Sequence, residues 1–150
     1  MKNNIEILIP TFNEGENIEK VIKELNQEGY KHITLLDANS TDKTVEIARQ
    51  NNCRIILDGP NISGFGGSLI NGLNNLQQDY FCVFDGDNSF DPKAIIEMLN
   101  EISKGAEFVF GTRYLNNTIS VDDTIITKFG KLHLNTGSQK SWGRSECAGG

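Results

Sequence analysis

The sequence predicts an α/β fold in which helices cover both faces of a mostly parallel sheet. Apolar strand-like runs alternate with amphipathic helix-like runs between residues 5 and 111, and the connections between them are short. Short right-handed crossovers make successive strands parallel. Charged residues and glycines gather directly after the strand-like runs, at the edge where such sheets bind ligands. The 150 residues have room for one such domain or for part of one.

The first expected strand is an apolar run over residues 5–9, closed by Pro10. Asn13 and Glu16 then have the spacing of a capping box, which predicts the start of a helix. An apolar stripe at i, i+3, i+4 and i+7 follows, and we expect Gly29 to end this helix. The stripe consists of Ile18, Val21, Ile22 and Leu25.

The next part of the chain repeats the pattern. We expect a second strand over residues 33–36, ending at Asp37, and a third over residues 55–57. Between them, Ser40 or Thr41 has the residue type of a helix N-cap. The inner face of this second helix is predicted to be Val45, Ile47 and Ala48.

A glycine-rich loop at residues 64–67 is expected to lead into a third helix, and residues 80–84 to form the fourth strand. Asp91 and Pro92 suit the N-cap and first position of a fourth helix. Residues 108–110 are the fifth expected strand, closed by Gly111. The apolar positions of the third and fourth helices are Leu69, Ile70, Leu73 and Leu76, then Ile95, Leu99 and Ile102.

Residues 131–150 differ in character from the rest of the chain. They show no periodicity, contain few apolar residues and end in small residues. We therefore divide the chain into a folded part, residues 1–130, and an irregular or disordered tail, residues 131–150, that does not belong to the native domain.

Charge and composition exclude several classes of protein. A net charge of −6 argues against nucleic acid as an electrostatic partner. The sequence lacks both a long apolar run and a signal-peptide pattern, which predicts a cytoplasmic protein. Cys53, Cys82 and Cys147 are far apart, which indicates reduced thiols of structural kind. Nothing in the sequence indicates the oligomeric state.

Asp85 and Asp87 follow the fourth expected strand at positions i and i+2. Alternate residues of an extended chain point the same way, so both carboxylates can converge beyond the strand end. Two oxygen ligands with open coordination positions suit Mg²⁺ or Mn²⁺ that also carries a diphosphate. The alternative is an acidic turn without a ligand, but the position at the ligand-binding edge favours the metal site.

Two further groups are candidates at this edge. Gly64 and Gly66 can bring backbone N–H groups close to an anion, although a plain flexible turn is the alternative. A dinucleotide fingerprint is disfavoured because it would follow the first strand rather than the third. Asp37 lies at a strand tip, where it can accept a hydrogen bond from a base or ribose, whereas Asp42 is better explained as part of a helix start.

Together these segments resemble the family-2 glycosyltransferases, and within them the branch of polyprenyl-phosphate (dolichyl-phosphate) mannosyl- and glucosyltransferases. The resemblance covers residues 5–130 in order and spacing. The segments are IPTFNE at 9–14, LDANSTDKT at 36–44, GFG at 64–66 with Gly72, DGD at 85–87 and GTRY at 111–114.

The resemblance implies a GT-A (Rossmann-like) fold, a nucleotide-sugar donor of the GDP-mannose or UDP-glucose type, and Mg²⁺ or Mn²⁺. It implies transfer of a hexose to an acceptor, a polyprenyl phosphate at the cytoplasmic face of a membrane, with inversion because the acceptor phosphate attacks in line. In the family, residues matching Pro10, Phe12, Glu14 and Asp37 line the nucleoside pocket, with Gly64, Gly66 and Gly86 also at the donor. Asp85 and Asp87 would hold the metal, Asp87 and Arg113 would be catalytic, and Arg113 would face the acceptor phosphate.

Some residues depart from the family pattern. Ala38 stands where many relatives have a second acid, and Ser63 stands where Lys or Arg is frequent. Asp122 and Asp123 stand where lipid-phosphate relatives often have basic residues. The resemblance stops near Gly130, so the chain looks truncated at its C-terminal side.

One alternative stays open from the sequence, a nucleotide-sugar-binding fragment or pseudoenzyme without transfer activity. A nucleotidyltransferase is disfavoured, because it would need a glycine-rich loop with a basic residue directly after the first strand, and residues 11–14 do not form one.

Overall fold

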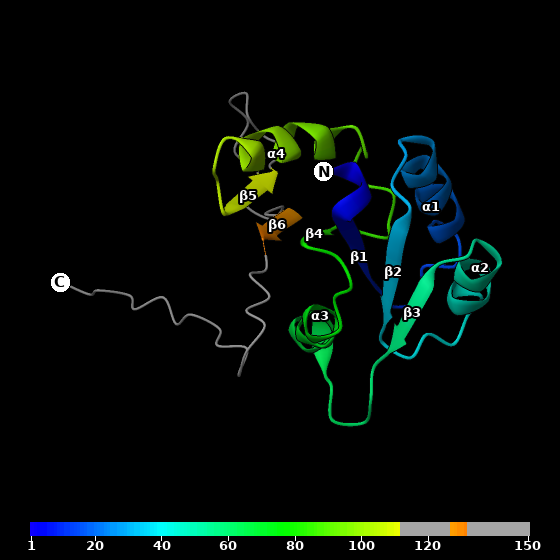
Figure 1. The fold of residues 1–150 in the computed structure, drawn as a ribbon. Helices are drawn as coiled ribbons and strands as arrows, with labels where there is room; N and C mark the ends of the chain where they lie inside the picture. Colours follow the sequence, from blue (N-terminus) through cyan, green and yellow to red (C-terminus); the bar gives the residue numbers. More distant parts are fainter. Residues whose placement is uncertain (112–126, 132–150) are drawn as a thin grey trace, which may run out of the picture.

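A computed structural model describes residues 1–111 and 127–131, and its six described strands form one sheet of order β3-β2-β1-β4-β6-β5 (Figure 1). Pairs β1–β2, β1–β4 and β2–β3 are parallel, whereas β6 runs antiparallel to both β4 and β5. The predicted mostly parallel sheet is therefore confirmed. The strands are β1 Ile5–Thr11, β2 His32–Asp37, β3 Arg54–Leu57, β4 Tyr80–Val83, β5 Phe108–Gly111 and β6 Thr127–Lys131.

Helices pack on both faces of the sheet, as predicted. In Figure 1, α3 lies on one side of β2 and β3, with α1 and α2 on the other. Side chains of β1 alternate between two cores: Ile5, Ile7 and Ile9 pack in one with α1, α2 and α4, and Leu8 packs in the other with α3. Burying each such side chain stabilises the fold by about 1.5–3 kcal/mol. The helices are α1 Ile18–Gln27, α2 Thr44–Gln50, α3 Gly64–Asn74 and α4 Ala94–Ser103, and a short 3-10 turn Lys2–Asn4 precedes β1.

The start of α1 differs from the predicted capping box. Asn13 has a left-handed backbone, with φ +57°. Its side-chain oxygen accepts a hydrogen bond from the Thr41 amide rather than from α1. The carbonyl of Glu14 instead accepts the amides of Asn17 and Ile18. The predicted end of the helix is confirmed, since Gly29 follows α1 with φ +86°.

The first turns of α2 and α4 are each capped by an aspartate. Neither Ser40 nor Thr41 caps α2, because Asp42 Oδ1 accepts the amide of Thr44 at 2.9 Å. Asp91 Oδ1 accepts the amide of Lys93 at 2.9 Å, as expected of a capping aspartate, but α4 is assigned only from Ala94, three residues after Asp91.

The glycines at residues 64–67 form the first turn of α3 rather than a loop before it. The helix presents most of the predicted face to the sheet, since Leu69, Leu73 and Leu76 pack in the core with Leu8 and Leu36. Its buried residues are Ser68, Gly72 and Leu73, and Ile70 is 56% exposed. Small residues face the sheet here, which lets the helix axis approach the strands closely.

Strand β6 was not predicted. Its sequence, TKFGK, has little apolar alternation, and it inserts between β4 and β5 although it follows both in the chain. Lys131, predicted to begin the tail, is instead the last residue of β6. Residues 132–150 lie outside the described residues, so the expectation of a tail there stays a prediction. In the described ranges, no helix has the length and apolar character needed to cross a bilayer.

Candidate functional site

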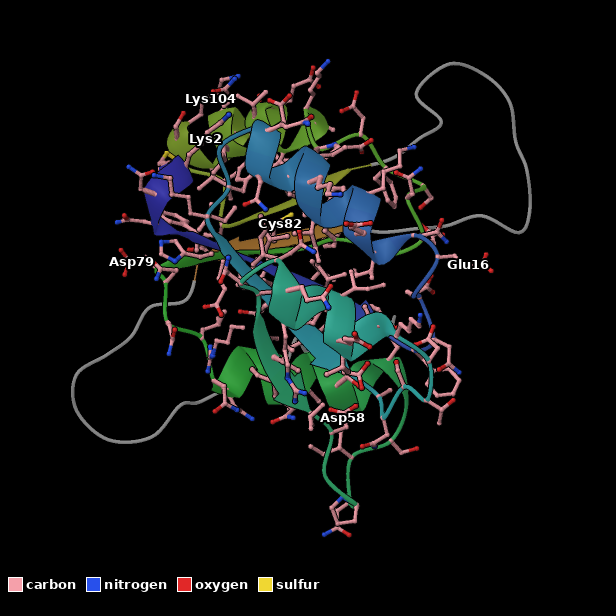
Figure 2. The ribbon with its side chains drawn as sticks, turned by 90° about the vertical axis from the view of Figure 1, so that its right-hand side faces the viewer. Lys2, Glu16, Asp58, Asp79, Cys82 and Lys104 are labelled. Carbon is pink, nitrogen blue, oxygen red and sulfur yellow. The ribbon has the colours of Figure 1, made fainter. Side chains whose placement is uncertain are left out.

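The predicted site residues follow β1, β2 and β4, whose carboxyl ends share one edge of the sheet. The parallel register pairs Thr11 of β1 with Asp37 of β2 at this edge. In Figure 2, Glu16 and Asp79 lie on opposite sides of the molecule. Glu16 follows β1 and Asp79 precedes β4, so the two residues mark opposite ends of the parallel strands. The topology therefore brings the loops carrying the predicted residues together.

The acidic pair sits in a tight turn directly after β4. The amide of Phe84 still donates to the carbonyl of Leu8, so the chain runs alongside β1 up to this point. Asp85 is half-buried and Asp87 is exposed. Asp87 Oδ1 accepts the amide of Ser89 at 2.9 Å, which closes the turn over the left-handed residue between them.

Gly86 places this turn against the end of β1. The residue is buried, and a Cβ atom at its position would lie 3.3 Å from Thr11 Cγ2 and 3.4 Å from Ile9 Cγ2. The same atom would lie 3.5 Å from Glu14 Cγ. A methyl group at this position would require Thr11 or the turn to shift by a few tenths of an ångström, so the acidic turn lies in close contact with β1.

Glu14 shares an electrostatic environment with the acidic pair. Partial burial raises the pKa of the Glu14 carboxyl, and the negative charges of Asp87, Asp42 and Asp85 raise this pKa further. A hydrogen bond with Asn17 opposes part of the rise. The edge therefore carries a concentration of negative charge that a bound cation would relieve.

The acidic pair fits a metal that brings its own phosphate ligands. Within residues 1–111 and 127–131, no three His, Cys, Asp or Glu side chains form a group that could hold a metal on their own. A closed zinc or calcium site needs more protein ligands than this turn supplies. Mg²⁺ and Mn²⁺ with a diphosphate need only one or two carboxylates, which Asp85 and Asp87 can provide.

Asp37 lies at the predicted strand tip, but its carboxylate is already bonded inside the protein. It is 1% exposed and accepts hydrogen bonds from Thr11 Oγ1 at 3.3 Å and from Ser40 Oγ at 2.6 Å. Its second oxygen accepts the amide of Ser40 at 2.9 Å. In this structure the Asp37 carboxylate binds Thr11 and Ser40 and so holds the end of β1 to the loop after β2. Its predicted contact with a base stays a prediction.

Two further segments carry predicted donor-site residues: the end of β1 with the residue that follows it, and the first turn of α3. Pro10 is half-buried, whereas Phe12 is 60% exposed and offers an aromatic face on which a planar base can stack. Gly64 and Gly66 lie in the first turn of α3, and the space within 4 Å of a Cβ atom on either glycine is open. Ser63, the N-cap, makes no side-chain capping bond, so the amides of this turn are suited to an anion.

Polar contacts of Asp58, the residue after β3, join this end of the strand to the middle of α3. Asp58 is buried, and its Oδ2 accepts a hydrogen bond from Ser68 Oγ. Asn71 Nδ2 donates to Asp58 Oδ1 at 3.4 Å, and the amide of Asp58 donates to the carbonyl of Asp37. Figure 2 shows Asp58 beside α3. Asp58 is not among the predicted site residues, although its place directly after a strand was a usable signal.

Some predicted residues lie outside the part of the chain that the structure describes. Arg113, the predicted contact of the acceptor phosphate, lies outside the described residues, as do Asp122 and Asp123. The two described cysteines have the structural character that was expected, since burial raises the pKa of the Cys53 thiol to about 11 and raises that of Cys82 as well.

The sequence matches Glycosyl transferase family 2 over residues 6–147. An uncharacterized protein of Methanocaldococcus jannaschii is 30% identical over 141 residues, covering 89% of this chain and 56% of that protein. Glycosyltransferase AglJ of Haloferax volcanii is 30% identical over 109 residues, covering 72% of this chain and 35% of AglJ. Dolichol-phosphate mannosyltransferase of Pyrococcus furiosus is 26% identical over 117 residues, covering 74% and 33%. The chain thus spans between 33% and 56% of the length of these relatives.

The fold is also similar to solved structures. Glucosyl-3-phosphoglycerate synthase of Mycobacterium tuberculosis, crystallised with Mn²⁺, UDP and glucosyl-3-phosphoglycerate, aligns with a TM-score of 0.62 at 22% identity. The alignment covers 72% of this chain and 42% of the synthase. This likeness confirms the predicted GT-A architecture, and the sequence match over most of the chain establishes the family. The chain belongs to the family-2 glycosyltransferases.

Proposed function

We propose that this chain is the nucleotide-sugar-binding part of an inverting hexosyltransferase whose acceptor is a polyprenyl phosphate. The observation that carries the proposal is the contact of the acidic turn with the end of β1 through Gly86. This contact puts the candidate metal ligands Asp85 and Asp87 next to the loop that carries Phe12 and Glu14. A nucleoside on that loop and a diphosphate at the acidic pair are then parts of one ligand.

On the donor side, Phe12 would stack on the base, and the first turn of α3 at Gly64 and Gly66 would face the phosphates. Asp85 and Asp87 would hold Mg²⁺ or Mn²⁺ at the diphosphate. A cation bound there supplies positive charge that stabilises the leaving nucleoside diphosphate. The Mn²⁺ and UDP in the structure of the similar synthase support a divalent metal and a nucleotide.

On the acceptor side, the name of the related dolichol-phosphate mannosyltransferase supports a polyprenyl phosphate as the acceptor. The cytoplasmic face of a membrane stays the predicted place of the reaction. An oxygen of the acceptor phosphate would form a bond to the anomeric carbon while the bond from that carbon to the donor diphosphate oxygen breaks. The electron pair leaves with the nucleoside diphosphate, and in-line attack inverts the anomeric centre. A phosphate anion needs little help from a general base, and Arg113 would balance its charge.

A calorimetric titration tests the donor site. UDP and GDP are each titrated with and without Mn²⁺ into the wild-type chain, Asp87→Asn and Asp91→Asn. Asp91→Asn is the matched control, because it removes the same charge from the neighbouring turn. We expect metal-dependent binding of one nucleotide that is lost in Asp87→Asn and kept in Asp91→Asn. Failure of the folded wild-type chain to bind either nucleotide would contradict the proposal.

Transfer is measured separately, with labelled donor and a short polyprenyl phosphate. Product formation that depends on Asp87 supports the hexosyltransferase. Binding without hydrolysis or transfer would instead favour the alternative of a nucleotide-sugar-binding module without activity.

A further inference from the structure

The loop after β1, residues 12–17, is bonded to the loop after β2, residues 38–43, and to the start of α2. We call these contacts the interloop network. Three successive amides of the first loop donate across the gap: Asn13 to Ser40 Oγ at 2.9 Å, Glu14 to Thr44 Oγ1 at 2.8 Å, and Gly15 to Asp42 Oδ2 at 2.8 Å. In the reverse direction, the Thr41 amide donates to Asn13 Oδ1 at 2.9 Å. The first loop therefore takes its shape from side chains of the second.

Asp42 and Thr44 form the centre of this network. Thr44 is fully buried, and its hydroxyl donates to Asp42 Oδ1 while it accepts the amide of Glu14. A hydroxyl has one proton, so its donation to Asp42 orients its lone pair toward Glu14. The hydrogen bonds from Thr44 hold the pKa of the Asp42 carboxyl below its usual range, with a contribution from the Gly15 amide. Asp42 thus sets the position of Glu14 through Thr44 and of Gly15 directly.

The two loops approach each other so closely that a side chain is excluded between them. A Cβ atom on Gly15 would lie 2.7 Å from Asp42 Oδ2 and 3.2 Å from Asp42 Cγ. Real Cβ atoms do not come this close to other heavy atoms, so glycine is required for the contact. The absence of a side chain on Gly15 thus allows the Asp42 carboxylate to reach the Gly15 amide.

Helix capping alone does not account for Asp42. Asp91 provides the comparison, since its Oδ1 accepts the amide two residues later, as Asp42 Oδ1 does. Asp91 makes that bond within its own turn, whereas the second oxygen of Asp42 reaches an amide 27 residues earlier in the chain. Asp42 therefore has a cross-loop contact in addition to its cap.

We propose that Asp42 and Thr44 are positioning residues for the nucleotide donor, through their hydrogen bonds to Gly15 and Glu14. Neither residue needs to touch the ligand. They hold the loop that carries Phe12 and Glu14 in the conformation that faces the acidic turn. The inference rests on the proposed function, because it takes this loop to be one wall of the donor site.

Two pairs of variants separate positioning from simple stability. Asp42→Asn keeps an oxygen for the cap of α2 but places its side-chain NH₂ group opposite the Gly15 amide, so two hydrogen-bond donors face each other. Asp91→Asn is the matched control, because it makes the same change at a cap without a cross-loop bond. Thr44→Val removes the hydroxyl and leaves the Glu14 amide unpaired, and Thr44→Ser restores it. For each chain we measure amide hydrogen exchange at Glu14 and Gly15, thermal unfolding, and the Kd of UDP and GDP with Mn²⁺ well below the unfolding temperature.

We expect faster exchange at Glu14 and Gly15 in Asp42→Asn and Thr44→Val. If the loop after β1 adopts its binding conformation for only about a tenth of the time in these variants, the Kd of the nucleotide rises about tenfold. Asp91→Asn and Thr44→Ser should stay close to the wild-type Kd, even where their unfolding temperatures fall. A Kd unchanged by Asp42→Asn, or slow exchange kept at both amides, would overturn the inference. Absence of nucleotide binding by the wild-type chain would instead refute the proposed function, and the positioning role with it.

Discussion

Glu14 lies against Gly86, with Glu14 Cγ 3.5 Å from the place that a Cβ atom would take on the glycine. This approach joins the loop after β1 to the acidic turn after β4, and it brings the Glu14 carboxyl under the influence of Asp85 and Asp87. The site thus depends on contacts between loops that are far apart in the sequence. Substitutions at these contacts, and in the packing that supports them, should therefore have measurable effects.

Gly86→Ala should destabilise the protein, because its methyl group would lie 3.3 Å from Thr11 Cγ2 and 3.4 Å from Ile9 Cγ2. Both neighbours belong to the end of β1 and cannot move freely. Crowding of this kind costs about 1 kcal/mol or more. Urea unfolding measures the change, and Gly59→Ala is the control because no atom lies within 4 Å of a Cβ there. Equal stability of the two variants would contradict the close approach.

Glu14→Gln should change the pH dependence of stability. Because the folded-state pKa of Glu14 is raised, its stabilising contribution is full below its ordinary pKa of 4.5 and is lost as pH rises through the folded value. The variant lacks this loss. The free energy of unfolding of the variant minus that of the wild type should therefore increase as pH rises. Denaturant unfolding with EDTA, from about pH 4 to about pH 7, measures the difference. A difference that stays constant or shrinks over this range would show that the raised pKa is wrong.

Gly72→Ala should destabilise the protein although alanine is the better helix former. A Cβ atom at this position would lie 2.6 Å from Leu36 Cδ1 and 2.7 Å from Leu36 Cδ2. In an exposed helix the same change stabilises by about 1 kcal/mol, whereas overpacking costs about 1–3 kcal/mol. Leu36 is fully buried, so we expect the loss to exceed the gain.

The matched control for this prediction is Gly66→Ala, in the same helix but with open space around its Cβ position. Its stability should not fall. Recovery of stability in Gly72→Ala combined with Leu36→Val would confirm that the two side chains compete for one volume. A stabilising effect of Gly72→Ala alone would contradict the packing of α3 on β2.

Glu6→Ala should be strongly destabilising without affecting the donor site. Glu6 is 2% exposed and accepts hydrogen bonds from Thr34 Oγ1 at 2.6 Å, from Arg54 Nη1 at 3.0 Å and from the Gln77 amide at 2.7 Å. The variant leaves buried donors without an acceptor, which costs about 1–3 kcal/mol for a buried group. Arg54 is 32% exposed and keeps its hydrogen bond to the Asn75 carbonyl, so water can solvate its charge. Because Glu6 lies near the opposite end of β1 from the site, the nucleotide Kd of the folded variant should equal the wild-type Kd. Thermal unfolding and calorimetry check both parts, and a weakened Kd would contradict the separation of the two ends.

The repeating elements could be predicted from the sequence because their apolar periodicity is strong. The stripe from Ile18 to Leu25 and the run over residues 5–9 each bury the side chains that the pattern indicates. Strand β6 could not be predicted in this way, since it pairs on both sides through its backbone and its sequence has little alternation. Its place between β4 and β5 is a property of the whole sheet.

The position of the candidate site could also be predicted, because polar residues after parallel strands meet at one edge. The roles of individual polar residues could not. Ser, Thr, Asn and Asp near a helix start can bond to their own turn or to another loop, and local spacing does not distinguish these options. Asn13 and Ser40 both bond across loops here, and Asp42 does both. Only the distance between the two loops in space decides the outcome.

The most direct test of the central claim is to locate a paramagnetic metal on the folded chain. Amide NMR signals are recorded while Mn²⁺ is added below stoichiometry, with and without UDP or GDP, to the wild type, Asp87→Asn and the control Asp91→Asn. We predict that, with the nucleotide that binds, Mn²⁺ broadens the amides of residues 85–89 first and those of Phe12 and Glu14 next, and that Asp87→Asn alone abolishes this pattern. Broadening centred elsewhere, or unchanged in Asp87→Asn, would contradict the assignment of this edge as the metal and nucleotide site.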